Sequence, residues 1–221
     1  MKIIPVGGYK NAFVFGPHPL ILHKLTILRD KTTNKKDCRE LVHELTLFLM
    51  AEATYALEVE DVTVQTPVAE CVGKRLSSKA DPVIFPIWRA GDGMKDAALQ
   101  MLPTANLGAI GMYRNEESKP VDYFHKPEEM PPGIVDVFIL DPMLATGGSA
   151  AAAVTLIKKS STSKLNIRFL SIFAAPQGIK CLSGEHPDIT IYTCVVDEGL
   201  NDHNYIVPGC GDMGDRLYGT K

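Results

Sequence analysis

One stretch, residues 135–152, constrains the fold of this chain more than any other. It reads Val-Asp-Val-Phe-Ile-Leu-Asp-Pro-Met-Leu-Ala-Thr-Gly-Gly-Ser-Ala-Ala-Ala. An apolar run ends at Asp141-Pro142, a turn of small residues follows, and an alanine-rich segment continues to Lys159. These three parts predict a strand, a loop and a helix in direct succession.

The loop Thr146-Gly147-Gly148-Ser149 has the properties of a phosphate-monoester site. It exposes successive backbone N–H groups, carries two hydroxyls and lies beside the positive end of a helix dipole. It is not a Walker P-loop, because Gly-Lys-Ser/Thr is missing. Asp141, at the carboxyl end of the predicted strand, is placed to meet sugar hydroxyls. For the two glycines alone, an ordinary glycine-rich turn with a helix cap would be the favoured interpretation.

Strands and helices alternate from residue 82 onward, which is typical of an α/β fold with a parallel sheet flanked by helices. An amphipathic helix from Asp37 to about Leu57 and a strand or arm over 61–68, outside the main sheet, precede this region. We therefore expect one domain made of an N-terminal helical and arm segment (1–80), an α/β core (81–196) and a C-terminal loop (197–221). The predicted core strands are 83–87, 107–113, 135–140, 167–174 and 189–196, with helices at 93–102 and 177–183.

Two arginines follow predicted strands of the core. Arg89 comes after the first strand and Arg114 after the second. Ligands of open parallel sheets bind beyond the carboxyl ends of the strands, so both arginines belong to the same rim as the predicted phosphate loop. Guanidinium groups match the oxygens of a diphosphate in pairs. Arg114 also opens a polar arm that runs to Pro132, a length typical of lids or binding arms.

The C-terminal segment Gly209-Cys210-Gly211-Asp212-Met213-Gly214 spells G-x-G-x-x-G. A dinucleotide site requires this motif to open a helix inside a βαβ unit, and only seven residues follow Gly214, so we reject that interpretation. A glycine-rich loop lets backbone N–H and C=O groups approach a flat ligand closely. The edge of a pyrimidine needs such a row of donors and acceptors.

Composition excludes several other classes of function. A net charge of −3 argues against a general nucleic-acid or anionic-membrane surface. The five cysteines are widely spaced and include no Cys-x-x-Cys pair, so they suggest neither a disulfide framework nor a zinc site. No apolar run approaches the roughly 18 residues of a membrane span. These features predict a cytoplasmic protein.

The segments 141–149 and 206–216 together resemble the uracil phosphoribosyltransferase family, and the similarity extends from His18 to the C-terminus. The resemblance implies the phosphoribosyltransferase fold. It also implies an enzyme that transfers ribose 5-phosphate from phosphoribosyl pyrophosphate (PRPP) to uracil, giving UMP and diphosphate in pyrimidine salvage. It further implies Mg²⁺ carried by PRPP near Asp212 without direct side-chain ligation, a response to GTP, and assembly as a homodimer or homotetramer.

The same resemblance assigns roles to individual residues. Arg114, Asp141 and Asp212 are the implied catalytic residues. Uracil is read largely by the backbone of Ile206, Gly211, Asp212 and Met213. PRPP is held by Arg89, Arg114, Asp141, Pro142, Met143, Leu144, Ala145, Thr146, Gly147, Gly148, Ser149 and Asp212.

Three residues depart from the family pattern: Asp92 and Cys210 replace leucines, and Met213 replaces an alanine. Asp92 adds a negative charge on the diphosphate side, and Met213 brings a longer side chain to the base loop. Two alternatives therefore stay open at this point. One is a non-catalytic sensor of UMP or PRPP on the same scaffold, and the other is the same enzyme class acting on a different base.

Overall fold

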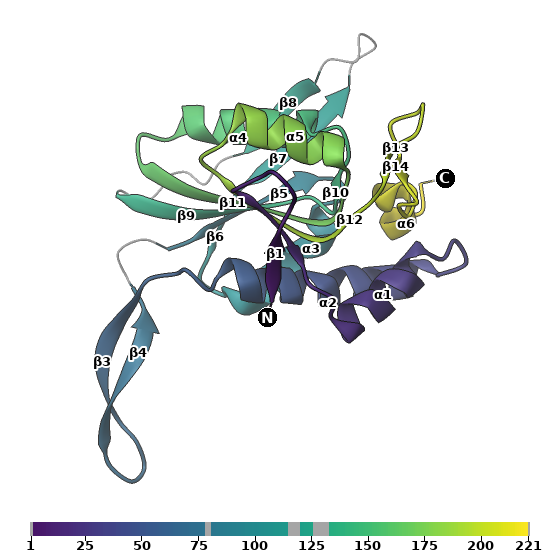
Figure 1. Ribbon diagram of the computed structural model, residues 1–221. Coiled ribbons are helices and arrows are strands. Elements are labelled where there is room, and N and C mark those ends of the chain that lie inside the picture. Colours follow the sequence, from purple (N-terminus) through teal and green to yellow (C-terminus); the bar gives the residue numbers. More distant parts are fainter. Residues whose placement is uncertain (1, 78–80, 115–119, 126–132, 221) are drawn as a thin grey trace.

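A mixed sheet forms the centre of the molecule (Figure 1). The computed structural model describes residues 2–77, 81–114, 120–125 and 133–220, and of residues 112–114 and 120–125 it describes the backbone. Within these residues the sheet runs in the order β1-β2-β12-β11-β9-β5-β7-β8, with β10 beside β11 and β6 beside β5. Its strands are β1 (Ile3–Pro5), β2 (Ala12–Phe15), β5 (Val83–Trp88), β6 (Asn106–Leu107), β7 (Ala109–Arg114), β8 (Pro120–His125), β9 (Ile134–Leu140), β10 (Met143–Leu144), β11 (Lys164–Ala174) and β12 (Thr190–Val196).

Pairing along the sheet is parallel from β2 to β7 and antiparallel at both edges, where β1 meets β2 and β8 meets β7. Two helices cover one face, namely α4 (Gly148–Ser160) and α5 (Pro176–Glu185). The other face carries α1 (Pro19–Arg29), α2 (Lys35–Ala53) and α3 (Asp92–Met101) (Figure 1). The predicted α/β architecture with a parallel sheet flanked by helices is confirmed.

The strand β9 shows why a continuous apolar run becomes a central strand. Successive side chains alternate between the two faces, so Val137 and Ile139 join the core under α4 and α5. Phe138 and Leu140 join the core under α2 and α3. All four are fully buried, and each contributes about 1.5–3 kcal/mol to folding.

The helix α2 begins at a side-chain cap that periodicity alone does not reveal. The Asn34 side chain accepts a hydrogen bond from the Asp37 N–H at 3.0 Å, which satisfies one free donor of the first turn. The apolar stripe of Leu41, Leu45 and Leu49 then faces the sheet and is buried. The helix ends at Ala53, four residues before the predicted end.

Strand β3 (Val59–Gln65) confirms the predicted arm outside the main sheet. It pairs with β4 (Glu70–Leu76), which the sequence did not predict, in a separate antiparallel hairpin that projects from the body (Figure 1).

The C-terminal segment has more regular structure than the predicted loop. It contains the short pair β13 (Gly199–Leu200) and β14 (Ile206–Val207), and the helix α6 (Met213–Tyr218).

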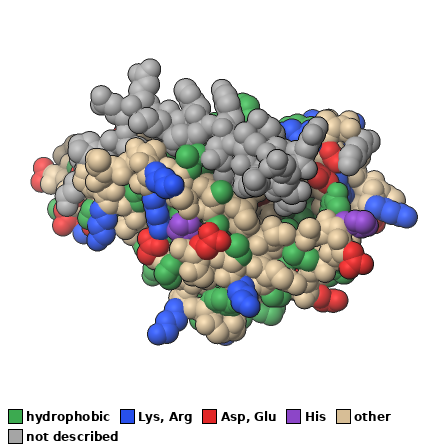
Figure 2. Space-filling view, turned by 90° about the horizontal axis from the view of Figure 1, so that it is seen from above, with side chains coloured by type: hydrophobic (Ala, Val, Ile, Leu, Met, Phe, Trp, Pro, Cys, Tyr) green, Lys and Arg blue, Asp and Glu red, His purple; other side chains and the backbone are tan. Residues whose placement is uncertain are grey.

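On the face shown in Figure 2, the described basic and acidic side chains are interspersed. Among the described residues, each helix is too short or too polar to cross a membrane.

Candidate active site

The predicted phosphate loop lies where β9 ends. The phosphate loop comprises the whole segment 141–149, in which Met143 and Leu144 form β10 and pair in parallel with the end of β11. Gly147 has a φ of +88° and is the N-cap residue of α4, without a side-chain cap. The first N–H groups of an α-helix have no partners within the helix, so those at the start of α4 are available to an anion.

A second helix presses against the back of this loop. A Cβ atom on Gly178 of α5 would lie 2.6 Å from the carbonyl oxygens of both Leu144 and Ala145. A Cβ atom on Gly147 would lie 2.7 Å from the Gly178 carbonyl oxygen. Real Cβ atoms do not approach so closely, so the loop and α5 contact each other through backbone that only glycine permits.

Asp141 stands at the carboxyl end of β9, where the sequence predicted it. Its Oδ1 atom accepts a hydrogen bond from the Met143 N–H at 3.2 Å, which favours the charged form. Desolvation outweighs this bond and raises the pKa of Asp141 to about 7. The carboxyl group therefore keeps its proton to a higher pH than an exposed aspartate does.

Arg89 follows β5, and the C-terminal segment holds its side chain. Its guanidinium group donates to Asp215 Oδ1 at 3.3 Å and to Thr220 Oγ1 at 3.2 Å. The Tyr218 hydroxyl donates to the Arg89 carbonyl at 3.2 Å. The Arg89 side chain remains 55% exposed, so it has room to bind an anion.

The charge added by Asp92 already has a partner, because Lys95 Nζ lies 2.8 Å from Asp92 Oδ1. The second predicted arginine, Arg114, is the last residue of β7, and its side chain lies outside the described residues. Most of the polar arm after it also lies outside them, apart from the backbone of β8.

The predicted base loop, residues 206–216, begins with β14 and continues into α6. Gly211 has a φ of +79° with open space where a Cβ would be, and Asp212 is the N-cap of α6, accepting from the Asp215 N–H at 2.9 Å. Met213 and Cys210 point into the core, and Met213 is 1% exposed. The longer Met213 side chain is therefore packed in the core and takes up no space at the rim.

Specific contacts bring the three rim segments together. Cys210 Sγ of the base loop lies 3.7 Å from Met143 Sδ of the phosphate loop. A Cβ on Gly214 would lie 3.2 Å from Asp212 Oδ1 and 3.5 Å from Arg89 Nη2, so the base loop also adjoins Arg89. Phosphate loop, arginine and base loop form one continuous rim.

Two arginines that the sequence did not single out fasten the base loop to the end of α1. Arg29 forms a two-pronged ion pair with Asp197 and also donates to the Gly209 carbonyl. Arg216 donates to the carbonyls of Leu28, Asp30 and Cys210. Arg216 lies inside the segment 206–216, and Arg29 lies in the wider similarity that begins at His18, so the family resemblance is the one signal that could have pointed to them.

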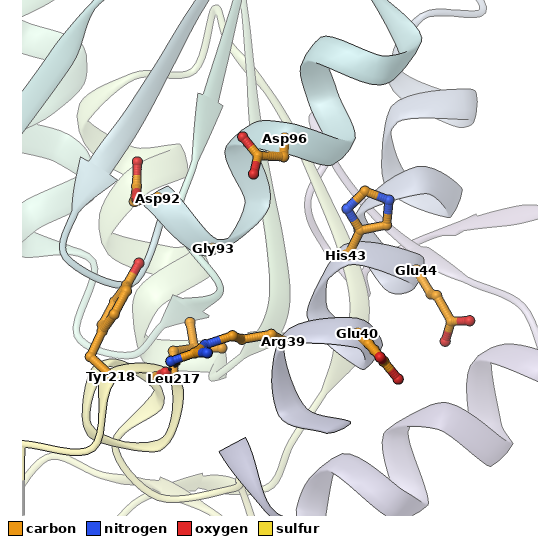
Figure 3. A pocket seen from close by; sticks show the side chains of 9 residues that line it. All are labelled: Arg39, Glu40, His43, Glu44, Asp92, Gly93, Asp96, Leu217 and Tyr218. Carbon is orange, nitrogen blue, oxygen red and sulfur yellow. Dashed lines mark hydrogen bonds between the residues drawn. The ribbon is translucent and has the colours of Figure 1, made fainter. Parts of the chain in front are cut away.

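A pocket of about 540 Å³ opens beside the rim between α2, α3 and α6 (Figure 3). A smaller apolar cavity of about 200 Å³ lies next to Trp88 and Arg89. Asp92 and Tyr218 line both cavities. Arg39 spans the floor and donates to the Leu217 carbonyl at 2.9 Å. The pocket therefore adjoins Tyr218, whose hydroxyl donates to the Arg89 carbonyl.

Comparisons with known proteins show the family to which the chain belongs. The family model described as uracil phosphoribosyltransferase matches residues 14–220. A uracil phosphoribosyltransferase of Streptococcus equi subsp. zooepidemicus is 53% identical over 206 residues, covering 92% of this chain and 96% of the relative. One from Lactococcus lactis subsp. cremoris is 50% identical over 207 residues, with the same two coverages.

Solved structures give the same result at the level of fold. The AQ2163 protein from Aquifex aeolicus superposes with a TM-score of 0.86 at 36% identity, covering 95% of this chain and 99% of its own. Adenine phosphoribosyltransferase from Trypanosoma brucei, solved with AMP, pyrophosphate and ribose-5-phosphate, superposes with a TM-score of 0.62 at 14% identity, covering 96% and 92%. The second likeness concerns the fold alone.

The parallel sheet with the segment 141–149 leading into α4 has the fold of a phosphoribosyltransferase, and the family model and the curated relatives place the chain in that class. Within that class, the chain belongs to the uracil phosphoribosyltransferase family, whose reaction joins uracil to the ribose 5-phosphate of PRPP. The family assignment decides for an enzyme over the non-catalytic sensor.

Proposed function

We propose that the rim binds PRPP and uracil side by side and transfers ribose 5-phosphate to a ring nitrogen of uracil, giving UMP and diphosphate. One observation carries this proposal. The phosphate loop touches the base loop through Met143 and Cys210, and the base loop touches Arg89 through Asp215. The segments that we propose for the phosphate, the base and the diphosphate thus adjoin one another, and the two substrates require such an arrangement.

The phosphate loop is the anchor in this scheme. Backbone N–H groups at the start of α4, together with Thr146 and Ser149, hold the 5′-phosphate. Asp141, in its charged form, accepts hydrogen bonds from the ribose hydroxyls. Fixing the sugar at both positions aligns the anomeric carbon with the base.

The reaction separates charge, with positive charge developing on the anomeric carbon and negative charge on the leaving diphosphate. Arg89, and Arg114 from the neighbouring strand, donate hydrogen bonds to the diphosphate and stabilise it. Among the described residues, no three His, Cys, Asp or Glu side chains are grouped to hold a metal ion. As the family resemblance implies, PRPP would carry a magnesium ion near Asp212. When bound, Mg²⁺ neutralises charge on the leaving group.

Uracil is read by backbone groups of Ile206, Gly211, Asp212 and Met213. Its edge alternates carbonyl acceptors with an N–H donor, whereas cytosine presents an amino donor where uracil has an acceptor. A backbone donor facing that amino group would stay unsatisfied, so the loop rejects cytosine. The positive φ of Gly211 lets its peptide groups take an orientation that other residues rarely adopt.

The test measures UMP formation and diphosphate release from PRPP and Mg²⁺ with uracil, cytosine, hypoxanthine or orotate. We expect activity with uracil, and we expect Gly211→Val to abolish UMP formation while PRPP still binds in calorimetry. Gly8→Val is the matched control, because Gly8 also has a positive φ (+84°) and open space around it. Gly8 precedes β2, at the opposite end of the sheet from the rim. A Gly211→Val protein that forms UMP at the parent rate would show that the base is read elsewhere.

We also infer self-association, as a homodimer or homotetramer, from the hairpin of β3 and β4. A two-stranded hairpin is at best marginally stable alone in water. This one carries exposed Val59, Val68, Val72 and Leu76. A partner subunit covering these side chains would stabilise it. Sedimentation velocity that gives the mass of one chain would refute this inference.

Regulation by GTP and a cytoplasmic location stay predictions.

A further inference from the structure

Asp197 is a buried carboxylate directly after β12, and its side chain is 4% exposed. Arg29, the last residue of α1, meets it with both guanidinium nitrogens, Nη2 to Oδ1 at 2.6 Å and Nη1 to Oδ2 at 2.9 Å. The arginine also stacks over the Phe173 ring at 4.8 Å. Two-pronged pairs of this kind are directional, so the pair has one preferred geometry.

The same two side chains hold both polar groups of the Gly209 backbone. The Gly209 N–H donates to Asp197 Oδ2 at 2.9 Å, and the Gly209 carbonyl accepts from Arg29 Nη1 at 2.8 Å. Gly209 lies between Ile206 and Gly211, the residues that begin and continue the proposed base loop. Fixing its peptide groups therefore fixes the direction in which the base-reading backbone leaves β14.

A second Arg–Asp pair in the molecule has similar chemistry but a different position. Arg168 Nη1 lies 2.6 Å from Asp136 Oδ1, and the Arg168 guanidinium stacks over Phe138 at 5.3 Å. This pair links β9 and β11 in their amino-terminal halves, away from the carboxyl ends of the strands, where the rim lies. Each pair joins separate elements, but it is the Arg29–Asp197 pair whose hydrogen bonds reach the base loop.

We propose that Arg29 and Asp197 are positioning residues for uracil: they hold Gly209 so that the backbone donors and acceptors of the base loop meet the pyrimidine edge. This inference rests on the proposed base site. Loss of the Arg29–Asp197 pair should affect the recognition of uracil, because other contacts hold the phosphate loop and Arg89. Loss of the pair weakens the use of uracil and leaves the use of PRPP nearly unchanged.

The experiment compares Asp197→Asn with Asp136→Asn. Asparagine keeps the size of the side chain and one acceptor for the Gly209 N–H, but it removes the charge that orients Arg29. For Asp197→Asn we expect the KM for uracil to rise about tenfold and the KM for PRPP to stay within about twofold. For Asp136→Asn we expect both constants to stay within about twofold, although Tm falls in both variants.

Arg29→Lys is measured alongside, since lysine keeps the positive charge but cannot make the two-pronged contact. It should raise the KM for uracil in the same way, which keeps the proposal testable if Asp197→Asn does not fold. An unchanged KM for uracil in either folded variant, or an equal rise in both KM values, would overturn the positioning role. The Gly211→Val variant separates the two proposals. If it abolishes UMP formation while Asp197→Asn is silent, the positioning role alone fails; if it is fully active, the base site fails too.

Discussion

Asp141 provides the sharpest test of the site, because its ionisation couples stability to function. Desolvation raises its pKa from 3.8 to about 7. In the folded protein the carboxyl keeps its proton up to about pH 7, whereas in the unfolded chain it loses the proton near pH 3.8. A group whose pKa is raised by folding favours the folded state less as pH rises between these two values. Replacing Asp141 by asparagine removes this loss.

The size of the effect follows from the pKa shift. Each pKa unit corresponds to about 1.4 kcal/mol, so the full shift corresponds to about 4 kcal/mol above pH 7. Asp141 is only partly removed from solvent, and screening reduces this figure. We expect Asp141→Asn to increase the free energy of unfolding by about 2 kcal/mol at pH 8 and by less than about 1 kcal/mol at pH 4.5.

Urea denaturation at the two pH values measures this difference. The control is Asp188→Asn, because a hydrogen bond from Lys158 lowers the pKa of Asp188. Loss of that carboxylate should decrease stability at pH 8, the opposite sign. An equal change at both pH values for Asp141→Asn, or a loss of stability at pH 8, would refute the argument.

The same variant should lose function while it gains stability. The charged carboxylate is the proposed acceptor for the ribose hydroxyls, so we expect PRPP affinity to fall about tenfold or more at pH 8. Trp88, the only tryptophan of the chain, adjoins Arg89 and offers a fluorescence signal for this titration. A stabilised Asp141→Asn protein that binds PRPP as tightly as the parent would remove Asp141 from the sugar site.

Two further substitutions test the phosphate loop. Thr146→Val removes a hydroxyl from the proposed cradle at nearly constant size and should weaken PRPP binding by about 1–3 kcal/mol in calorimetry; unchanged affinity in a folded protein would contradict the phosphate assignment. Gly178→Ala places a Cβ 2.6 Å from two loop carbonyls and should raise the KM for PRPP several-fold through displacement of the loop. Gly184→Ala on the same helix is its control, because a Cβ there meets open space, and equal kinetics for the two variants would argue against the glycine contact.

The central part of the fold could be predicted from the sequence because its signals are local. The β9 strand is an uninterrupted apolar run that ends at Asp141-Pro142, and α4 is rich in alanine. Both signals lie within the elements themselves, so the observed limits of β9 and α4 agree closely with the predicted ones. The family resemblance then named the rim segments, although the roles of their residues stay predictions, as does the single-domain organisation.

The missed elements depend on partners that are distant in sequence or weak in pattern. The four residues of β2 form a strand because they pair with β12, nearly 180 residues later. The β4 strand is exposed on almost its whole length and so lacks the alternation of a half-buried strand. The positioning arginine Arg29 reads as the ordinary basic end of a helix, and only the folded chain brings Asp197 to it.

The meeting of the two chain ends has a consequence for how the protein is made. β2 completes the sheet against β12, and α1 is fastened to the base loop by Arg29 and Arg216. During synthesis, β2 and α1 therefore cannot make these contacts until β12 and the base loop have been made. Contacts of such large sequence separation slow folding, and they leave the apolar face of α2 without part of its cover until the C-terminal strands and α6 are made. A chain that stops before Ile206 already contains Arg29 but lacks the base loop that Arg29 holds, so the proposed uracil site cannot form until residues 206–216 are made.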